Sequence, residues 1–295
     1  MIRAIVVLMI GGAGLMDGAP VDAALKPQLE RSYAVWRDAM IRKDARAWQA
    51  ATAAHRQMGV RNRLVSERRA FPQSVFELPA APPTLKGLVA VQVMSSGATA
   101  RAVYFGKVDF NVGGEPSDNL LVLSFVNEGG AWKYDTADFV NLGGLPEVRK
   151  ELASGVTNYV AETKAFRPDG KVPPTPRAVA QAKYIAKVYV FCPGREVQVH
   201  VNKISRHRFV DAKLAEVVLG GARDGANEVQ YSVKGAEGGK GNEPMTIRVY
   251  LLSQVPGVKP VKVYEYQVDE GGKVNGFGSA NFVVDATIVA KYAGR

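Results

Sequence analysis

The sequence is poor in the residue types that form covalent and metal sites. Only one of its 295 residues is a cysteine, Cys192, and only three are histidines. A lone cysteine excludes an intramolecular disulfide, and the apolar context "YVFCPGRE" is typical of a small buried residue rather than a reactive thiol. His200 and His207 have no cysteine or carboxylate pair at ligand spacing nearby. We therefore expect no metal site and no cofactor.

Recognisable catalytic motifs are also missing. No serine stands in a Gly-x-Ser-x-Gly setting, and "GGARDG" lacks the strand-then-helix context of a phosphate-binding loop. Two tyrosine–aspartate pairs are candidates for acid–base chemistry, but neither converges. Tyr33 and Asp38 would lie about 140° apart around a helix, and Tyr104 and Asp109 would lie on opposite sides of a strand. No catalytic residue is predicted, and we expect a non-enzymatic protein.

Long hydrophobic runs are absent beyond the first residues. Arg3 is followed by the apolar stretch "AIVVLMIGGAGLM", and "VDAAL" offers small residues for cleavage after Ala23. This pattern predicts a signal peptide over residues 1–23, the alternative being a buried N-terminal helix. The stretch is too short to span a bilayer comfortably, and no cysteine near the cleavage point could carry a lipid. We expect an exported protein, periplasmic or extracellular, without a membrane span.

Negative charge is in deficit. The net charge is +10, while 47% of the residues are hydrophobic. Because the basic excess is spread along the chain, it favours anionic surfaces in general and does not define a groove for nucleic acid. The expected partner is an envelope protein or an anionic polymer or ligand, with no nucleic acid. The length is sufficient for two domains that each bury a core.

Helical periodicity marks the first part of the expected mature chain. Leu29, Tyr33, Trp36 and Met40 recur at three- and four-residue steps, which predicts one amphipathic helix. Asp44 is placed to cap the start of a second helix. The runs "KGLVAVQVMSS" and "ATARAVYFGKVDF" that follow are rich in β-formers and predict strands.

A hairpin is predicted around the turn 127–130. An apolar run, "LLVLSFV", leads into "NEGG", and the return strand "AWKYDTADF" alternates apolar and polar residues. In a regular strand Trp132, Tyr134 and Thr136 would share one face.

The second part of the chain is predicted to consist of strands. A helix expected from Pro146 to about residue 164 is followed by the proline-rich linker "FRPDGKVPPTPRAV". The domains expected are 24–144, a helix and linker over 145–182, and 183–295. Strands are expected in seven runs, which are "KYIAKVYVFC", "EVQVHVNKIS", "KLAEVVLG", "NEVQYSVK", "PMTIRVYLLSQV", "PVKVYEYQV" and "SANFVVDATIVAKY". The segment "GAEGGKGNEP" is expected to be a flexible hairpin loop.

Residues 27–142 resemble the NTF2-like superfamily. The resemblance lies in a Trp-bearing helix, the segment "KDARAW", and the ending "LLVLSFVNEGGAWKYDTADF". It implies an α+β fold in which a curved antiparallel sheet wraps around helices and leaves a conical pocket. Such folds serve as enzymes, ligand pockets or association modules, so the resemblance leaves function open.

Residues 183–294 resemble the accessory β-sandwiches of secreted proteins, of Ig-like or galactose-binding-like type. The pattern is "VQVHVNKIS" followed by "LAEVVLGGARDGANEVQYSV". The resemblance implies an antiparallel β-sandwich used for binding or scaffolding. The tyrosines of this half fall inside predicted strands, where core or cross-strand packing accounts for them more simply than sugar stacking.

Arginines gather in "VRNRLVSERRAFP", residues 60–72. In an extended segment Arg61 and Arg63 would point the same way and could rim the first-domain pocket, offering forked contacts to a carboxylate or phosphate. The alternative is a solvated face, or pairing with neighbouring acids. The candidate ligand-binding residues are Tyr33, Trp36, Arg61, Arg63 and Tyr104.

The function expected is therefore that of an exported, non-enzymatic binding or association protein of the cell envelope. One alternative is an NTF2-like small-molecule-binding or hydrolytic enzyme with an Arg-rimmed pocket, and another is a carbohydrate-binding module. A filled first-domain core would favour binding, and a polar cavity would favour an enzyme. A homo-oligomer formed through a sheet face is a further expectation.

Overall fold

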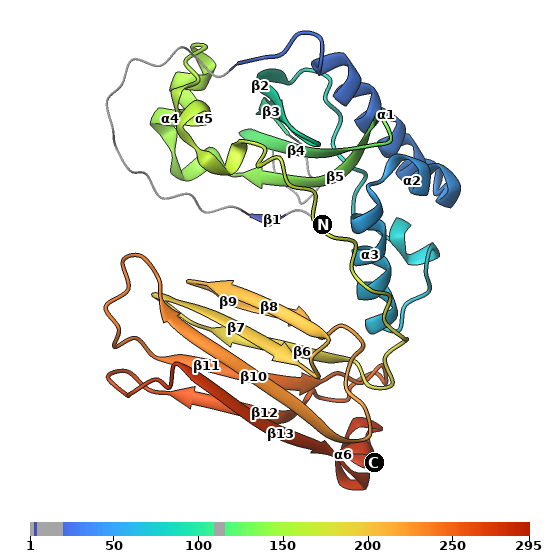
Figure 1. Ribbon diagram of the computed structural model, residues 1–295, viewed down its shortest axis with the longest axis vertical. Coiled ribbons are helices and arrows are strands. Elements are labelled where there is room, and N and C mark those ends of the chain that lie inside the picture. Colours follow the sequence, from blue (N-terminus) through green and yellow to red (C-terminus); the bar gives the residue numbers. More distant parts are fainter. Residues whose placement is uncertain (1–2, 5–19, 109–115) are drawn as a thin grey trace. The chain divides into compact units, whose positions relative to one another are not determined.

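The computed structural model describes residues 3–4, 20–108 and 116–295. The chain forms two compact units (Figure 1), of which unit 1 comprises Met1–Gly59 with Val75–Pro176, and unit 2 comprises Val60–Ser74 with Arg177–Arg295. Helices and antiparallel sheets both occur, which confirms the α+β class. Most of the predicted signal peptide, and Asp109, lie outside the described residues.

Unit 1 contains a five-stranded sheet in the order β1-β5-β4-β3-β2. All neighbouring strands are antiparallel except β1, which pairs with β5 in parallel. The central strand β4 is buried on both faces, so the sheet separates two apolar layers. The strands are β1 (Arg3–Ala4), β2 (Val89–Ser96), β3 (Thr99–Lys107), β4 (Asp118–Glu128) and β5 (Ala131–Val140).

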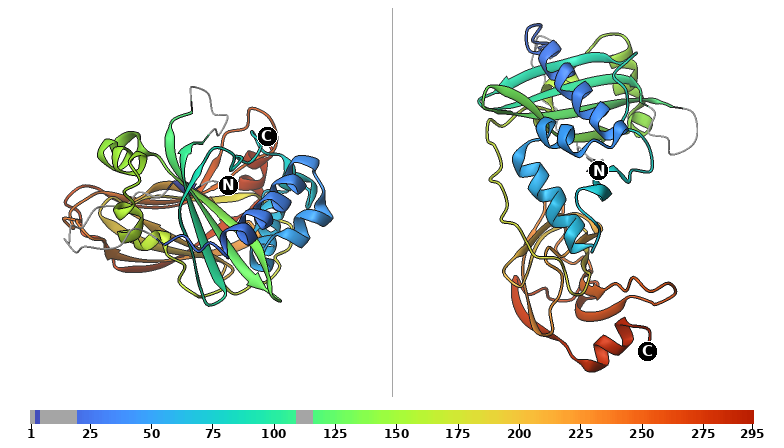
Figure 2. Two further views of the ribbon diagram at one scale, coloured as in Figure 1. Left: turned by 90° about the horizontal axis from the view of Figure 1, so that it is seen from above. Right: turned by 90° about the vertical axis from the view of Figure 1, so that its right-hand side faces the viewer.

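Helices cover both faces of this sheet, and Figure 2 shows α1 lying across one of them. The predicted stripe on α1 is confirmed, because Leu29, Tyr33, Trp36 and Met40 are buried. The Asp44 side chain accepts a hydrogen bond from Ala47 N, as expected of an N-cap. The helical elements up to Phe166 are α1 (Lys26–Arg42), α2 (Ala45–Ala51), α3 (Ala54–Ser66), α4 (Pro146–Ala153), α5 (Asn158–Glu162) and the 3₁₀ turns η1 (Gln73–Phe76), η2 (Leu142–Gly144) and η3 (Lys164–Phe166). The division between the two units falls inside α3, after Gly59, and inside η1, after Ser74.

The region after residue 145 differs from the single helix predicted there. The helix stops at Ala153 and restarts at Asn158, because Gly155 adopts φ +88°, a left-handed conformation that ends helices. Val156, expected in the buried stripe, is 41% exposed. Phe166 is fully buried in the layer formed by α4, α5 and the sheet, so the chain belongs to the core of unit 1 up to this residue.

A β-bulge interrupts β5. Ser124 pairs with Thr136 and Phe125 pairs with Tyr134, which leaves Asp135 without a partner in the ladder. The strict alternation predicted for this strand is therefore wrong beyond Tyr134, because an extra residue in one strand reverses the faces that follow it. The predicted turn at Gly129 and Gly130 is confirmed, and both glycines have positive φ.

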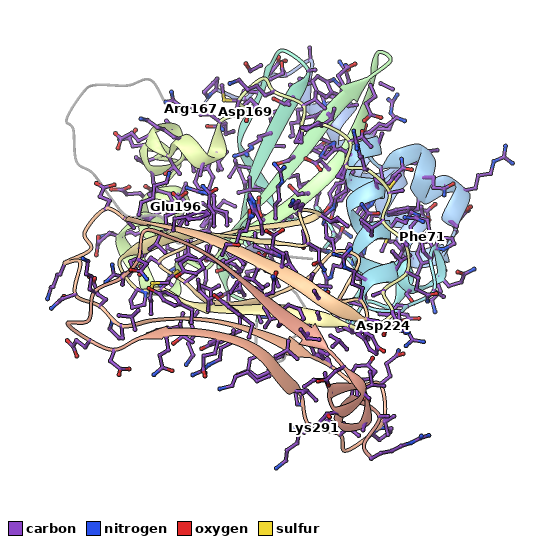
Figure 3. All side chains as sticks on the ribbon, turned by 60° about the horizontal axis from the view of Figure 1, so that its bottom comes forward. Phe71, Arg167, Asp169, Glu196, Asp224 and Lys291 are labelled. Carbon is purple, nitrogen blue, oxygen red and sulfur yellow. The ribbon has the colours of Figure 1, made fainter. Side chains whose placement is uncertain are left out.

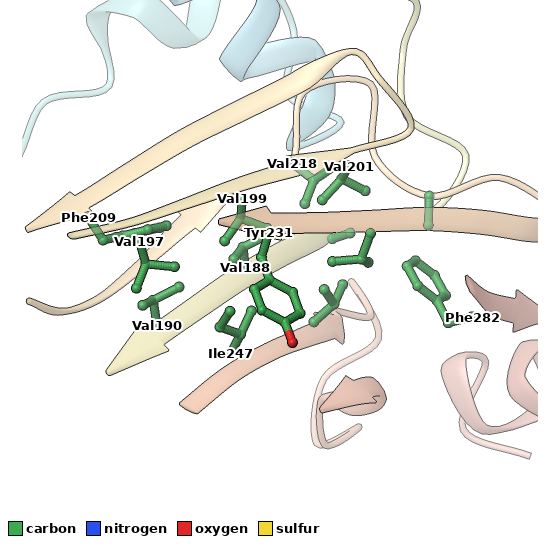
Figure 4. Close-up of a cluster of buried hydrophobic side chains, with 14 of the residues drawn as sticks. Val188, Val190, Val197, Val199, Val201, Phe209, Val218, Tyr231, Ile247 and Phe282 are labelled. Atoms are coloured by element: carbon green, nitrogen blue, oxygen red, sulfur yellow. The ribbon is translucent and has the colours of Figure 1, made fainter. Parts of the chain in front are cut away.

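Unit 2 is a sandwich of two four-stranded antiparallel sheets, in the orders β13-β10-β7-β8 and β12-β11-β6-β9. Alternate residues of β6, β7, β10 and β11 point into a shared core, in which Val188, Val199 and Ile247 are fully buried (Figure 4). The elements are β6 (Ala186–Phe191), β7 (Arg195–Val201), β8 (Ser205–Val210), β9 (Lys213–Val217), β10 (Gly225–Gly235), β11 (Met245–Leu251), β12 (Val261–Val268), β13 (Phe277–Val284) and α6 (Ala286–Tyr292).

Two predictions for this half are wrong. The predicted run "EVQVHVNKIS" ends at Ser205, and Ser205–Val210 forms a further strand, β8, that is not among the seven predicted runs. Ala286–Tyr292 forms helix α6 instead of continuing the last strand, because the Asp285 side chain accepts a hydrogen bond from Ile288 N and caps a helix start. The described chain between Phe166 and Ala186 contains no helix or strand, only one isolated β-bridge at Tyr184.

The loop between β10 and β11 is held in place by a buried arginine. Arg195 Nη2 donates hydrogen bonds of 2.8 Å to Gly241 O and to Glu243 O. The Glu243 side chain in turn accepts from Lys240 N and Gly241 N. The loop that was expected to be flexible is therefore tied to the end of the sandwich.

Candidate functional site

An aromatic cluster lies between α1 and the sheet of unit 1. The ring centroids of Tyr33 and Trp36 are 5.7 Å apart, and those of Trp36 and Tyr134 are 3.7 Å apart and stacked. The three-residue spacing of Tyr33 and Trp36 places both on the helix face that meets β5. Tyr33 Oη donates to Pro83 O at 2.8 Å, and burial raises the pKa of Tyr33. The two predicted ligand residues are thus packed as core residues.

Tyr104 lies in the same layer. It is 1% exposed, and its hydroxyl donates to Glu30 Oε1 of α1 at 3.2 Å. Burial raises the pKa of Tyr104, and the neighbouring Glu30 carboxylate raises it further. Its hydroxyl already has a protein partner, so Tyr104 serves to join β3 to α1.

Arg61 and Arg63 belong to unit 2, whereas the aromatic cluster belongs to unit 1. They lie on helix α3, where residues two apart project about 160° from each other. This differs from the extended segment considered from sequence. Arg61 Nη1 donates to Val179 O at 3.1 Å, and Arg63 Nε lies 3.2 Å from Glu67 Oε1. Both guanidinium groups are engaged in contacts within the fold.

An imidazole–carboxylate pair in unit 1 was missed from sequence. His55 Nε2 of α3 lies 2.9 Å from Asp135 Oδ1, with side-chain exposures of 12% and 16%. The bulge in β5 displaces Asp135 from the ladder, which is a recurrent way of re-aiming a side chain. Within the described part of the chain, Trp36 Nε1 and His55 Nδ1 are buried and have no hydrogen-bond partner. No sequence spacing could have joined these residues, because they come from separate elements.

A hydroxyl–imidazole–carboxylate chain closes one edge of the sandwich. Ser205 Oγ lies 2.7 Å from His207 Nε2, and His207 Nδ1 lies 2.8 Å from Glu216 Oε2. The order of groups is that of a nucleophile, a base and an orienting acid. Ser205 is, however, fully buried, and its Oγ also accepts from Leu219 N at 2.8 Å. We assign this chain a structural role in which it joins the edge strands β8 and β9 of the two sheets.

The outer face of the sheet β12-β11-β6-β9 carries aromatic and basic side chains. Inward positions of β6 and β11 are fully buried, so the half-exposed residues between them point outward. In the strand register, Arg248 of β11 lies directly opposite Tyr189 of β6 on one side and Glu265 of β12 on the other. We call this surface the aromatic face; its residues are Lys187, Tyr189, Phe191, Lys213, Thr246, Arg248, Tyr250, Lys262, Glu265 and Gln267.

Arg248 stands at the centre of the aromatic face. Its Nε lies 2.5 Å from Glu265 Oε1, and its Nη2 donates to Gln267 Oε1 at 3.0 Å. Glu265 also pairs with Lys262. Hydrogen bonds from Lys262 and Arg248 lower the pKa of Glu265, so its carboxylate stays charged and accepting.

The outer face of the opposite sheet is polar and carries a glutamate–arginine ion pair. Glu196 of β7, labelled in Figure 3, accepts from Arg208 Nε at 3.0 Å and from Arg208 Nη2 at 2.7 Å. Gln198 also donates to Glu196. The hydrogen bonds from Arg208 and Gln198 lower the pKa of Glu196 to about 2. The exposed Phe277 on β13 is the aromatic residue of this face.

The described residues contain neither a metal-binding cluster nor a membrane-spanning helix. No group of three or more metal-ligating side chains occurs among them. No described helix combines the length and the apolar character that crossing a bilayer requires. Cys192 is fully buried, and burial raises the pKa of its thiol.

Comparison with known proteins gives no family. No protein-family model and no curated protein matches the chain. A weak similarity is found to the solved pair of C2 domains of extended-synaptotagmin 2, at 10% sequence identity and a TM-score of 0.13. The match covers 60% of this chain and 74% of that chain. At this TM-score the similarity carries no argument about fold or function.

Proposed function

We propose that this chain is an exported, non-enzymatic binding protein of the cell envelope, and that the sandwich is its ligand-binding part. The observation that carries the proposal is the aromatic face, on which Tyr189, Phe191 and Tyr250 are half-exposed around Arg248. Aromatic rings and arginine are the side chains that contribute most to recognition surfaces. The apolar N-terminal stretch and the predicted cleavage site support export.

Packing in unit 1 supports binding over catalysis. Tyr33, Trp36 and Tyr104 were the candidates for a pocket, and all three are core residues that are at most 8% exposed. A helix-then-antiparallel-sheet order of NTF2-like type is part of the proposal, in which unit 1 is an association module. Under this proposal unit 1 supplies a stable body and the sandwich supplies the contact surface.

The export part is tested by fractionation. The full chain should appear outside the cytoplasm with Ala24 as its first residue, and a Val7→Arg variant should be retained inside. Cleavage after Ala23 would remove Pro20 and Asp22, whose backbones exchange hydrogen bonds of 2.9 Å with Val93 of β2. An exported product that still contains residues 20–22 would move the cleavage site upstream, and a wholly cytoplasmic product would refute export.

The binding part is tested by co-sedimentation of the purified full chain with washed envelope material. We expect a bound fraction that saturates and that is reduced by a Tyr189→Ala/Tyr250→Ala double variant. The matched control is Phe277→Ala, which removes a 66% exposed ring from the opposite outer face. Equal binding by all three proteins would refute the aromatic face as the contact surface.

A second candidate function is small-molecule binding in unit 1. The observation favouring it is the His55–Asp135 pair, with Trp36 Nε1 and His55 Nδ1 buried and without a hydrogen-bond partner among the described residues. Such atoms are rare in folded proteins and are commonly satisfied by a bound molecule or water. A metabolite that raises the melting temperature of the wild type, and of a control Asp38→Asn, but not of His55→Ala, would establish this function. No stabilisation by any compound would exclude the site as a ligand pocket at the concentrations used.

A further inference from the structure

We infer that the aromatic face binds an acidic polysaccharide, with its rings stacking on sugar faces and its lysines contacting carboxylate groups. The inference rests on the proposed function, because it names the ligand class of the same surface. Tyr189 and Phe191 lie two residues apart on β6, so their Cα atoms are about 6.6 Å apart along the strand. Tyr250 lies on the neighbouring strand opposite Lys187, two residues from Tyr189, so it is a diagonal neighbour of Tyr189 on the same face. The three ring-bearing positions therefore lie near one another on the two central strands.

The polar groups beside the rings match sugar hydroxyls. A hydroxyl both donates and accepts hydrogen bonds, and the centre of the face offers both kinds of partner. Arg248 is a donor, the Glu265 carboxylate is an acceptor, and the Gln267 amide is both. Their mutual contacts fix these side chains in place, which reduces the entropy lost when a ligand binds.

The charge of the face favours an acidic sugar over a neutral one. Glu265 is already paired with both Arg248 and Lys262. Lys187 and Lys213 lie on the same face, at the register positions of Tyr250 and Phe191, and no acid of the face pairs with them in the described structure. Anionic groups on the ligand would form ion pairs with these two lysines, and salt would weaken this contribution to affinity by screening it.

The hydrogen-bonding groups of the face distinguish a polysaccharide from single-stranded nucleic acid, which also uses rings and basic groups. A phosphodiester backbone presents only acceptors to the protein, so it has no donor for the Glu265 carboxylate on the neighbouring strand β12. The hydroxyl-rich backbone of a polysaccharide has donors for that carboxylate. Polysaccharide is therefore the ligand class that uses every group of the face.

The test measures binding of the full chain to three probes by isothermal titration and affinity electrophoresis. The probes are polygalacturonate, the neutral glucan dextran, and a twenty-residue oligothymidylate. We expect polygalacturonate to bind, with a dissociation constant that rises about tenfold for Tyr189→Ala or Tyr250→Ala, as the loss of one stacked ring predicts. A Lys187→Gln/Lys213→Gln variant should lose most of the salt dependence of binding. Phe277→Ala should bind as the wild type does, and the melting temperature of every variant identifies those that fail to fold.

Each other outcome overturns the inference in a distinguishable way. Binding to envelope material without binding to polygalacturonate would refute the ligand class and leave the proposed function intact. Tighter binding of oligothymidylate would assign the face to nucleic acid. Dextran binding equal to polygalacturonate binding would remove the role of the two lysines. A wild-type dimer that Tyr189→Ala dissociates in sedimentation velocity would assign the face to a second copy of the chain, and failure to bind either envelope material or polysaccharide would refute both proposals.

Discussion

Replacing Ser205 by alanine tests whether the hydroxyl–imidazole–carboxylate chain is structural. Ser205 Oγ contacts two groups at once, His207 Nε2 at 2.7 Å and Leu219 N at 2.8 Å. Alanine would leave both without a partner. A buried polar group without its partner costs about 1–3 kcal/mol, and the half-buried Leu219 N should fall at the lower end. We expect unit 2 to lose about 2–4 kcal/mol of its free energy of unfolding.

Calorimetry of the full chain is the suitable assay. For a unit of this size, a loss of that order lowers the melting temperature by roughly 10 °C. The transition of unit 1 should not move, because Ser205 belongs to unit 2. Ser279→Ala is the matched control; it removes an exposed serine from the outer face of β13 and should change stability by less than about 0.5 kcal/mol.

Two results would refute the structural assignment. The first is a Ser205→Ala protein as stable as the wild type, which would mean that the buried contacts contribute nothing. The second is covalent labelling of Ser205 by a fluorophosphonate together with ester hydrolysis that the variant loses. That result would mean that β8 and β9 open far enough to expose the serine, and that the three groups act as a nucleophilic triad.

Three further predictions concern unit 2. The pKa of Glu196 is lowered to about 2 from 4.5, so its pairing with Arg208 stabilises unit 2 fully above about pH 4.5, and this stabilisation is lost as the pH falls through about 2. Urea unfolding of the wild type and of Glu196→Gln at pH 6, 4 and 2 should therefore show a difference in stability that shrinks at pH 2. Asn62→Ala should destabilise unit 2 by about 2–4 kcal/mol in the same assay at pH 7, because this fully buried amide accepts from one backbone group and donates to another. Gly278→Ala should lower the melting temperature, whereas Gly276→Ala should not, because a Cβ at Gly278 would lie 2.4 Å from the Tyr231 ring while one at Gly276 meets only an atom 3.8 Å away.

Local patterns account for the elements that sequence predicted well. The stripe on α1 follows from residues at three- and four-residue spacing, which a helix places on one side whatever packs against it. The turn at Gly129–Gly130 follows from the positive φ that glycine tolerates. The strands of the sandwich alternate so regularly that their inward positions could be assigned without the structure, as Val197, Val199 and Val201 illustrate.

The features that sequence did not predict depend on contacts between distant segments or on a single local cap. The bulge at Asp135 is visible only in the pairing of β4 with β5, because neither strand alone indicates which residue leaves the ladder. Helix α6 contains apolar β-branched residues and resembles a strand until Asp285 is recognised as its cap. Ser205 and His207 are two residues apart, so a strand places both side chains on one face, which is visible in the sequence. The third member of the hydroxyl–imidazole–carboxylate chain, Glu216, comes from the other sheet and could not be joined to them from sequence.

The placement of aromatic residues decides which part of the molecule can bind a ligand through a sheet. In unit 1 both faces of the sheet are covered, one by α1 and the other by α4, α5 and η3. In the sandwich the inner faces form the core and the outer faces remain. One outer face carries the Glu196–Arg208 ion pair, and its exposed ring, Phe277, lies on an edge strand. The other places its rings on the two central strands, beside lysines that no acid of that face neutralises, and this combination is the reason that binding is assigned there.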